Sequence, residues 1–334
     1  MGRSLRQLSH KLAGKIGQAH WFLAPDRGEP IVLMYHGVNG NTAGRDADGD
    51  HKHVGEARFR QHLDLLAKHR NVVPLSQLVN ALLAGEDCRG KVAITFDDGY
   101  LNNAEAAAPV LKHYGMSATF FLATGFIGVQ RWAWTDRVEH VVATARAQTA
   151  ELRLGEGAGA PATITIGSAQ DRVDLMRRIK ARLKLLHWRE AEQEIEAIAK
   201  ALQVPSEAPA GKYRFMSWEQ ARQLLRDGFE VGAHTVNHAI LSRVPVDTAR
   251  EEILGSQSRI LAELGSCCAT FCYPNGRATD FTAAVADICR GHFDAALSAI
   301  IGTARAEDRF EIRRIGVEHA TTPERLAARI LQGS

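Results

Sequence analysis

The chain has 334 residues, of which 45% are hydrophobic and 24% charged, and its formal net charge at pH 7 is +3. This composition is ordinary for a globular protein with a large core, and so small a net charge gives no reason to expect a nucleic-acid partner. No apolar run approaches the roughly 20 residues that a membrane-spanning helix needs.

The first predicted element is a basic amphipathic segment at residues 1–27. Leucine and isoleucine recur at helical spacing between residues 5 and 16, accompanied by arginine and lysine, and the continuous apolar stretch of a signal peptide is missing. Such a helix either lies on an anionic membrane surface or packs on the protein body. The five cysteines form no regular framework, which favours a reducing compartment. We therefore expect a cytoplasmic protein, peripheral to the inner membrane if the segment binds lipid.

Short buried strands then alternate with helices. Apolar runs that end in turn residues predict strands at residues 31–35, 91–96 and 118–123. Apolar residues at helical spacing predict the intervening helices at residues 56–69, 76–83 and 103–113. This order implies parallel strands joined by crossover helices.

The alternation is interrupted by a largely helical insertion at about residues 131–211 and resumes beyond it. Further strands are predicted at residues 229–233, 269–273, 294–298 and 313–317, and a C-terminal helix at residues 321–334. We therefore predict an α/β protein with one domain at residues 28–320 that contains the insertion. About seven alternating strands favour a closed or nearly closed barrel, whose site lies at the carboxyl ends of the strands.

Two motifs at predicted strand ends carry chemistry. Asp97 and Asp98 stand in Thr-Phe-Asp-Asp-Gly-Tyr, and a turn at Gly99 would let both carboxylates reach one pocket. Alone, such a pair is most often a solvated turn. His234 and His238 are spaced i, i+4, which on one helical turn places both imidazoles on one side.

Together the two motifs predict a metal site. Asp98, His234 and His238 form a two-histidine, one-carboxylate set, which leaves open positions for water and substrate, as catalytic zinc requires. Iron accepts the same ligand types. Asp97 would then remain for proton transfer.

At these residues the chain resembles the polysaccharide deacetylases of the NodB-homology type, carbohydrate esterase family 4. The segment 95–100 matches the family's first signature, and His234-Thr-x-x-His238 matches its second. Phe-Cys-Tyr-Pro-Asn-Gly at residues 271–276 resembles the third, and Leu-Met-Tyr-His-Gly-Val at residues 33–38 resembles the opening of one branch. The resemblance spans residues 31–317 except the insertion. It implies a deformed (β/α)7 barrel.

The resemblance also implies roles for individual residues. Asp97 would be the general base, and Asp98, His234 and His238 would hold a divalent metal. Zn²⁺ is the first expectation, with Co²⁺, Ni²⁺, Mn²⁺ or Fe²⁺ as alternatives. The backbone N–H of Asn275 would stabilise the oxyanion. The expected substrate contacts are His36, Tyr100, Tyr273, Pro274 and Trp134.

Two parts of the family pattern are missing. Cys272 occupies the place of the arginine that orients the base in many relatives, and Arg314 is favoured over Arg313 to supply that charge from elsewhere. The final Leu-x-His signature, whose histidine is the general acid, has no clean match. His319 is the nearest candidate for this acid, and His36 is the other.

The predicted function is therefore metal-dependent removal of N-acetyl groups from an amino sugar. The sugar would belong to a glycan or to a lipid-linked saccharide, such as a polyprenyl-linked intermediate of surface polysaccharide or lipopolysaccharide biosynthesis. The alternatives are a sugar deformylase or other amide hydrolase, and a catalytically weak carbohydrate-binding relative.

Overall fold

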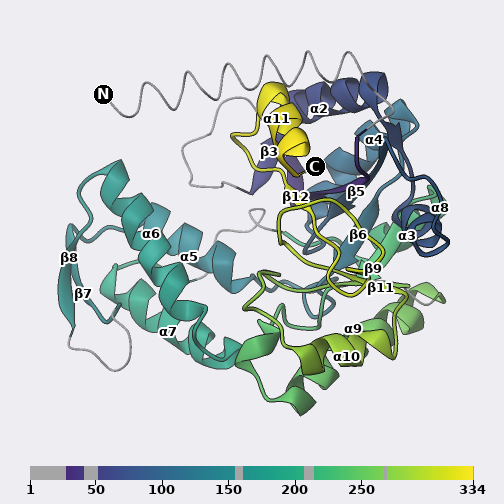
Figure 1. Ribbon diagram of the computed structural model, residues 1–334. Helices are drawn as coiled ribbons and strands as arrows, with labels where there is room; N and C mark the ends of the chain where they lie inside the picture. Colours follow the sequence, from purple (N-terminus) through teal and green to yellow (C-terminus); the bar gives the residue numbers. More distant parts are fainter. Residues whose placement is uncertain (1–27, 41–51, 155–160, 207–213, 267–268, 334) are drawn as a thin grey trace.

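The computed structural model describes residues 28–40, 52–154, 161–206, 214–266 and 269–333 (Figure 1). The predicted amphipathic segment of residues 1–27 lies outside the described residues, so that helix stays a prediction. Among the described helices, none combines the length and the apolar composition that crossing a membrane requires.

A parallel sheet forms the centre of the molecule. Its strands follow the order β11-β10-β9-β6-β5-β1-β12, and β4 pairs with the start of β5. The bounds are β1 (Ile31–Tyr35), β4 (Asn71–Val72), β5 (Lys91–Phe96), β6 (Thr119–Leu122), β9 (Glu230–Ala233), β10 (Thr270–Cys272), β11 (Ala295–Leu297) and β12 (Ile315–Gly316).

The ring of strands closes through one short contact. Between β11 and β12, Leu297 makes a single parallel bridge to Ile312, and the Ser298 N–H donates to the Ile312 carbonyl at 2.8 Å. β12 itself pairs with β1, in the register Leu33 to Ile315. The predicted α/β architecture with a deformed seven-stranded barrel is thus confirmed.

Helices surround the sheet. They are α2 (Glu56–His69), α3 (Leu75–Leu83), α4 (Ala108–Tyr114), α8 (Trp218–Arg226), α9 (Val246–Leu264), α10 (Ala283–Arg290) and α11 (Pro323–Gly333), with a 3₁₀ turn, η3, at Leu241–Arg243. α11 packs beside α2, although more than 250 residues of sequence separate them (Figure 1). One predicted helix is divided, because its first turn, η2 (Asn103–Ala107), is a π-helix. Pro109 has no backbone N–H, so the α-helical ladder is interrupted there.

The strands are buried on both faces, as parallel strands between two layers must be. In β5, Ile94 and Phe96 join the core beneath the outer helices, whereas Ala93 joins a second cluster inside the barrel. Side chains of α3, such as Leu78, also belong to that inner cluster. The alternation follows from the two-residue period of a strand, and it decides which residues beyond Phe96 point inward.

The insertion forms a lobe beside the barrel (Figure 1). It contains α5 (Trp134–Ala143), β7 (Thr149–Leu152), β8 (Ala162–Thr165), α6 (Ala169–Leu183) and α7 (Trp188–Ala201). Its apolar side chains, among them Val141, Ile179 and Ile195, form a cluster separate from the barrel core. A two-stranded parallel ribbon, β2 (Gly37–Asn39) with β3 (His53–Gly55), precedes α2.

Candidate functional site

The carboxyl edge of the sheet brings the two sequence motifs together. Asp97 and Asp98 directly follow β5, and His234 directly follows β9, which is separated from β5 only by β6. Asp97 continues the inward-facing set of Ala93 and Thr95, so its carboxylate points into the barrel. Asp98 reaches the same space because its φ of 76° turns the chain at that residue.

Asp98, His234 and His238 converge on one point. The distances from Asp98 Oδ1 to His234 Nε2 and to His238 Nε2 are 3.3 and 3.2 Å, and the two imidazole centroids are 5.0 Å apart. The predicted helical turn between the histidines is wrong. Residues 234–238 form a loop with positive φ at Thr235 (63°) and His238 (55°), conformations that L-residues keep only when their surroundings enforce them.

Two contacts hold this loop and its first histidine. Glu252, buried on α9, accepts the backbone N–H groups of Val236 and Asn237 at 3.0 and 2.7 Å. The Cys272 carbonyl lies 2.7 Å from His234 Nδ1. Because a carbonyl only accepts, Nδ1 donates to it, and Nε2 is the nitrogen that faces Asp98.

This triad fits a divalent cation. Asp98 Oδ1 is buried and has no hydrogen-bond partner among the described residues, yet two imidazole nitrogens face it. Burial raises the pKa of Asp98, but the neighbouring His238 and His234 outweigh burial and hold this pKa well below its usual range. The carboxylate is therefore ionised, and the donor set is one that zinc accepts.

A second group, Asp97, His234 and Cys272, also places its potential ligand atoms within 4.8 Å of one another. It is a poorer cation site, because Arg314 already occupies it. The guanidinium donates to Asp97 and lies 3.0 Å from the Cys272 sulfur, so its charge would repel a metal ion. We assign the metal-binding potential to Asp98, His234 and His238.

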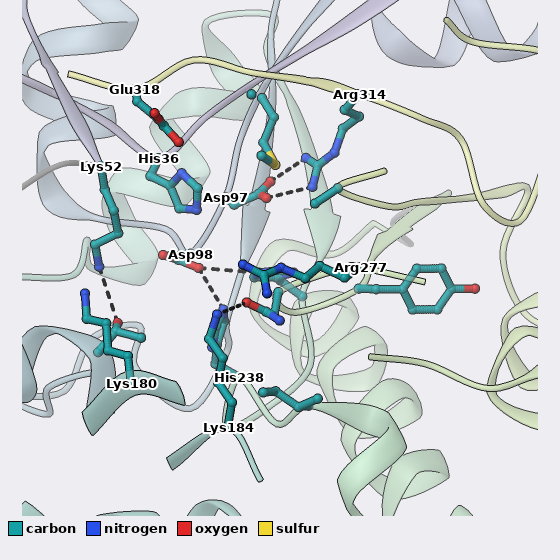
Figure 2. Close-up of a pocket in the computed structure, with 18 of the residues that line it drawn as sticks. His36, Lys52, Asp97, Asp98, Lys180, Lys184, His238, Arg277, Arg314 and Glu318 are labelled. Atoms are coloured by element: carbon teal, nitrogen blue, oxygen red, sulfur yellow. Dashed lines mark hydrogen bonds and ion pairs between the residues drawn. The ribbon is translucent and has the colours of Figure 1, made fainter. Parts of the chain in front are cut away.

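Arg314 crosses the barrel interior to Asp97. Its Nη1 and Nη2 donate to the two carboxylate oxygens, each at 2.8 Å, and its Nε donates to the Ser298 carbonyl at 2.7 Å (Figure 2). Burial raises the pKa of Asp97, but the charge and hydrogen bonds of Arg314 hold this pKa below its usual range. Asp97 is thus an oriented, ionised carboxylate. Cys272 stands where the sequence pattern expects an arginine. Arg314, which directly precedes β12, supplies the guanidinium instead.

The loop after β10 supplies one backbone donor. Asn275 has a φ of 60°, and within the described residues its N–H donates to no acceptor. Its side-chain amide donates to the buried Asp280, which also accepts the Arg277 N–H at 2.9 Å. Asn275 Oδ1 accepts from Lys184 Nζ at 2.6 Å.

These residues line a cavity of about 610 Å³, within the range of small-molecule sites (Figure 2). Its lining includes His36, Trp134 and Asn275 from the predicted set, together with Asp97, Asp98, His234, His238 and Arg314.

Other predicted residues lie elsewhere. Tyr100 is buried against Phe215, and its hydroxyl donates to Asp136 at 2.8 Å, so it fastens the insertion to the barrel and does not line the cavity. Tyr273 lines it, but its hydroxyl donates to the Phe310 carbonyl at 2.9 Å and its ring stacks on Phe281. Pro274 and His319 are not among the lining residues.

Sequence reasoning missed the basic residues of the cavity: Lys52, Lys180, Lys184, Arg277 and Arg329. Lys180 and Lys184 are spaced i, i+4 at the end of α6, which would have indicated a shared helix face. Nothing in the sequence indicated that this face of the insertion borders the barrel. Glu252 was also missed, although an acid within the apolar stripe of α9 was a usable signal.

Comparisons with known proteins agree with this geometry. The family model "Polysaccharide deacetylase" matches residues 84–154 and 186–289, together just over half of the chain. The Bacillus subtilis (strain 168) protein YxkH, which is named as a polysaccharide deacetylase, is 36% identical over 101 residues. That match spans 29% of this chain and 33% of YxkH, so it covers about a third of the relative's length.

Solved structures share the fold. The Streptococcus pyogenes deacetylase PplD, in complex with acetate, has a TM-score of 0.59 at 17% identity, and the match covers 91% of this chain and 97% of PplD. IcaB from Ammonifex degensii has a TM-score of 0.58 at 18% identity, with the same coverage. A de-N-acetylase from Aggregatibacter actinomycetemcomitans has 0.56 at 16% identity, covering 90% of this chain and 99% of that one.

The fold and site define an α/β-barrel protein with a histidine–aspartate donor set at the carboxyl ends of its strands. With the family match, the chain belongs to the polysaccharide deacetylase family. The resemblance inferred from the sequence motifs is confirmed.

Proposed function

We propose that the protein is a metal-dependent hydrolase that removes N-acetyl groups from an amino sugar. One observation carries this proposal. Asp97 is buried, ionised and oriented by two hydrogen bonds from Arg314, and it lies in the same cavity as the Asp98–His234–His238 set. An ionised base beside a divalent-metal donor set is the minimum that amide hydrolysis by water requires.

Asp98, His234 and His238 would hold the metal ion, which when bound supplies Lewis acidity and makes water more acidic. Asp97 accepts the proton of the water that attacks the acetamide carbonyl, and Arg314 keeps this carboxylate in place. The Asn275 N–H, which has no acceptor among the described residues, donates to the oxyanion that develops on the carbonyl oxygen. The C–N bond then breaks, and the amine leaves after receiving a proton.

We assign that last proton to His36 and not to His319. His36 lines the cavity beside Asp97 and Asp98, whereas His319 does not line it (Figure 2). A general acid must reach the atom that it protonates. We expect His36→Gln to lower kcat by about a hundredfold, in line with the usual contribution of general acid catalysis, and His319→Gln to leave it within about threefold. Equal losses in the two variants would remove this assignment.

An acetate-release assay tests the function. Zinc-loaded protein should release acetate from an N-acetylglucosamine oligomer or from a lipid-linked N-acetyl sugar. Asp97→Asn should lower the rate by at least about a thousandfold while elemental analysis still finds the metal. The control is Asp247→Asn, an exposed aspartate on α9, which should retain full rate. Full activity in Asp97→Asn would eliminate Asp97 as the base.

We also propose the kind of molecule that carries the amino sugar. A lipid-linked saccharide of surface polysaccharide synthesis suits a cytoplasmic, membrane-peripheral protein, which the basic residues 1–27 and the free cysteines support. Sedimentation with anionic liposomes, compared between the full chain and a chain without residues 1–22, tests the membrane part. Equal sedimentation of the two proteins would contradict it. A deformylase would use the same groups, and parallel formate and acetate assays separate these two activities.

A further inference from the structure

The cavity holds more positive charge than the proposed reaction uses. Lys52, Lys180, Lys184, Arg277 and Arg329 line it besides Arg314. Three of these five cations have a carboxylate partner. Lys52 pairs with Asp136 and Lys180 with Glu139, each at 2.5 Å, and Arg329 lies 3.7 Å from Glu318.

Lys184 and Arg277 are different. Within the described residues, neither side chain has a carboxylate partner, and the polar partner of Lys184 is the neutral amide oxygen of Asn275. The nearby Asp280 is engaged by the Asn275 amide and by the Arg277 backbone N–H. Among the described residues, two cations of the cavity lining thus have no ion-pair partner.

Burial and the neighbouring cations disfavour the positive charge of Lys184. Burial and the charges of Arg277 and Lys180 lower the pKa of Lys184 to about 8, against the opposing effect of Asp280. A charge that is disfavoured in this way is stabilised when an anion binds beside it.

The two cations also lie beside the reaction centre. Lys184 donates to the residue whose N–H faces the oxyanion position, and Figure 2 shows Lys184 and Arg277 directed toward the space beside Asp98 and His238. They come from different parts of the chain, Lys184 from the end of α6 in the insertion and Arg277 from the loop after β10. The insertion therefore helps to build the cavity and supplies part of its charge.

We propose that Lys184 and Arg277 form an anion subsite that binds a phosphoryl group attached to the amino sugar. A phosphoryl group has several oxygens that can accept from an ammonium and a guanidinium at once, whereas a carboxylate is satisfied by one bidentate arginine. The cavity of about 610 Å³ has room for a monosaccharide with such a group. This inference rests on the proposed function and narrows its substrate to phosphorylated amino sugars, whether sugar 1-phosphates, nucleotide sugars or lipid-linked sugar phosphates.

Binding to zinc-loaded Asp97→Asn protein tests the subsite without turnover. Calorimetry should show that N-acetylglucosamine 1-phosphate binds about tenfold or more tightly than methyl N-acetylglucosaminide, as one or two charge-assisted hydrogen bonds predict. Added Lys184→Gln or Arg277→Gln should remove most of this preference, and Lys184→Arg should keep it. The neutral sugar should bind each variant equally well.

Two matched controls remove a positive charge outside the cavity. Lys200 and Arg178 are exposed on α7 and α6 and do not line the cavity, so Lys200→Gln and Arg178→Gln should leave the phosphate preference intact. If they weaken binding as much as the cavity variants do, the effect is long-range charge and the subsite is refuted. Equal affinity for the phosphorylated and neutral sugars also refutes it.

Further ligands distinguish the sources of the anion. N-acetylmuramic acid places a carboxylate on the sugar, and binding as tight as that of the 1-phosphate would overturn the phosphoryl assignment. Tightest binding of a uridine diphosphate sugar or of a polyprenyl-phosphate sugar would support it and identify the carrier.

Failure of the subsite and failure of the proposed function give different results. Acetate release from phosphorylated sugars at rates that Lys184→Gln and Arg277→Gln leave unchanged would refute the subsite alone. A phosphate preference without acetate release from any sugar would refute the hydrolase alone.

Discussion

The ion pair between Asp97 and Arg314 is the most consequential contact between single residues in the site. Both side chains are almost fully buried, with exposed fractions of 5% and 1%, and two hydrogen bonds of 2.8 Å join them. Burying a charge costs several kcal/mol unless its partner is in place. The pair therefore couples the chemistry of Asp97 to the stability of the barrel.

Arg314→Met should destabilise the protein by about 3 kcal/mol or more, because it leaves the Asp97 carboxylate buried without its partner. Urea unfolding measures this loss. Replacing Asp97 by asparagine in the Arg314→Met background should recover part of it, since the uncompensated charge is gone. Arg313→Met is the control. Its side chain is 42% exposed and its contact with Asp308 is 3.4 Å, so the loss should stay below about 1 kcal/mol. Similar losses in both arginine variants would contradict the buried-pair account.

The sequence predicted the positions of the principal site residues because each follows a strand whose period is readable. Asp97 inherits its inward direction from Ala93 and Thr95, and His234 directly follows Ala233 at the end of β9. The strained backbone conformations of the site could not be predicted from the sequence. Positive φ values at Asp98, Thr235, His238 and Asn275 result from tertiary contacts such as those of Glu252, and no local pattern announces them.

Among the helices and strands, the predicted and observed bounds agree best where the apolar pattern and a turn or capping residue indicate the same end. α2 and β5 have the predicted bounds, and α4 ends at Gly115, which adopts a left-handed conformation. Long-range placement was not predictable. Arg314 was expected at Asp97 only from the family resemblance, and the approach of α6 to the cavity depends on which elements pack together, which a single sequence does not report.

One buried histidine links α2 to the segment before α11. His62 Nε2 lies 2.9 Å from the Thr321 carbonyl, so it carries the proton, and Nδ1 accepts from the Tyr35 hydroxyl at 3.2 Å. The neutral ring is fully satisfied. Burial lowers the pKa of His62 to about 4, against a smaller opposing effect of the Thr321 hydrogen bond.

This shift predicts acid sensitivity. The unfolded chain, with an ordinary histidine pKa of about 6.5, binds the proton between pH 6.5 and 4 while the folded protein does not. Stability from this group is therefore fully present above pH 6.5 and falls as the pH drops toward 4, by roughly 3 kcal/mol. His62→Gln keeps a donor and an acceptor but does not titrate.

The measurement is urea unfolding at pH 7.5 and pH 4.5 for both proteins. The difference between the two pH values should be smaller in His62→Gln by about 2 to 3 kcal/mol. His113→Gln, at an exposed position on α4, should behave as the parent chain does. An unchanged pH difference in His62→Gln would show that His62 is not responsible.

At the scale of the whole molecule, the site is assembled from segments that lie far apart in the sequence. The donors come from the turns after β5 and β9, the base is oriented by Arg314 from the last strand region, and Lys184 comes from the insertion. The insertion has an apolar cluster of its own and is fastened to the barrel by polar contacts, including Lys52 with Asp136 and Arg131 with Asn237. A ligand that contacts several of these segments should therefore also stabilise the folded protein against unfolding.

A divalent metal should stabilise the folded protein against unfolding, because Asp98, His234 and His238 form its site only when the sheet is assembled. At a free Zn²⁺ concentration of about 100 times the dissociation constant, the gain should be roughly 2.7 kcal/mol and should vanish on chelation. His238→Asn should lose most of it. His292→Asn, which removes an exposed histidine, controls for zinc on the surface and should keep the full gain. Thermal unfolding with and without zinc measures all three proteins. If zinc stabilises His238→Asn as much as the parent chain, the ion binds somewhere other than the Asp98–His234–His238 set, and the metal assignment fails independently of any assay of turnover.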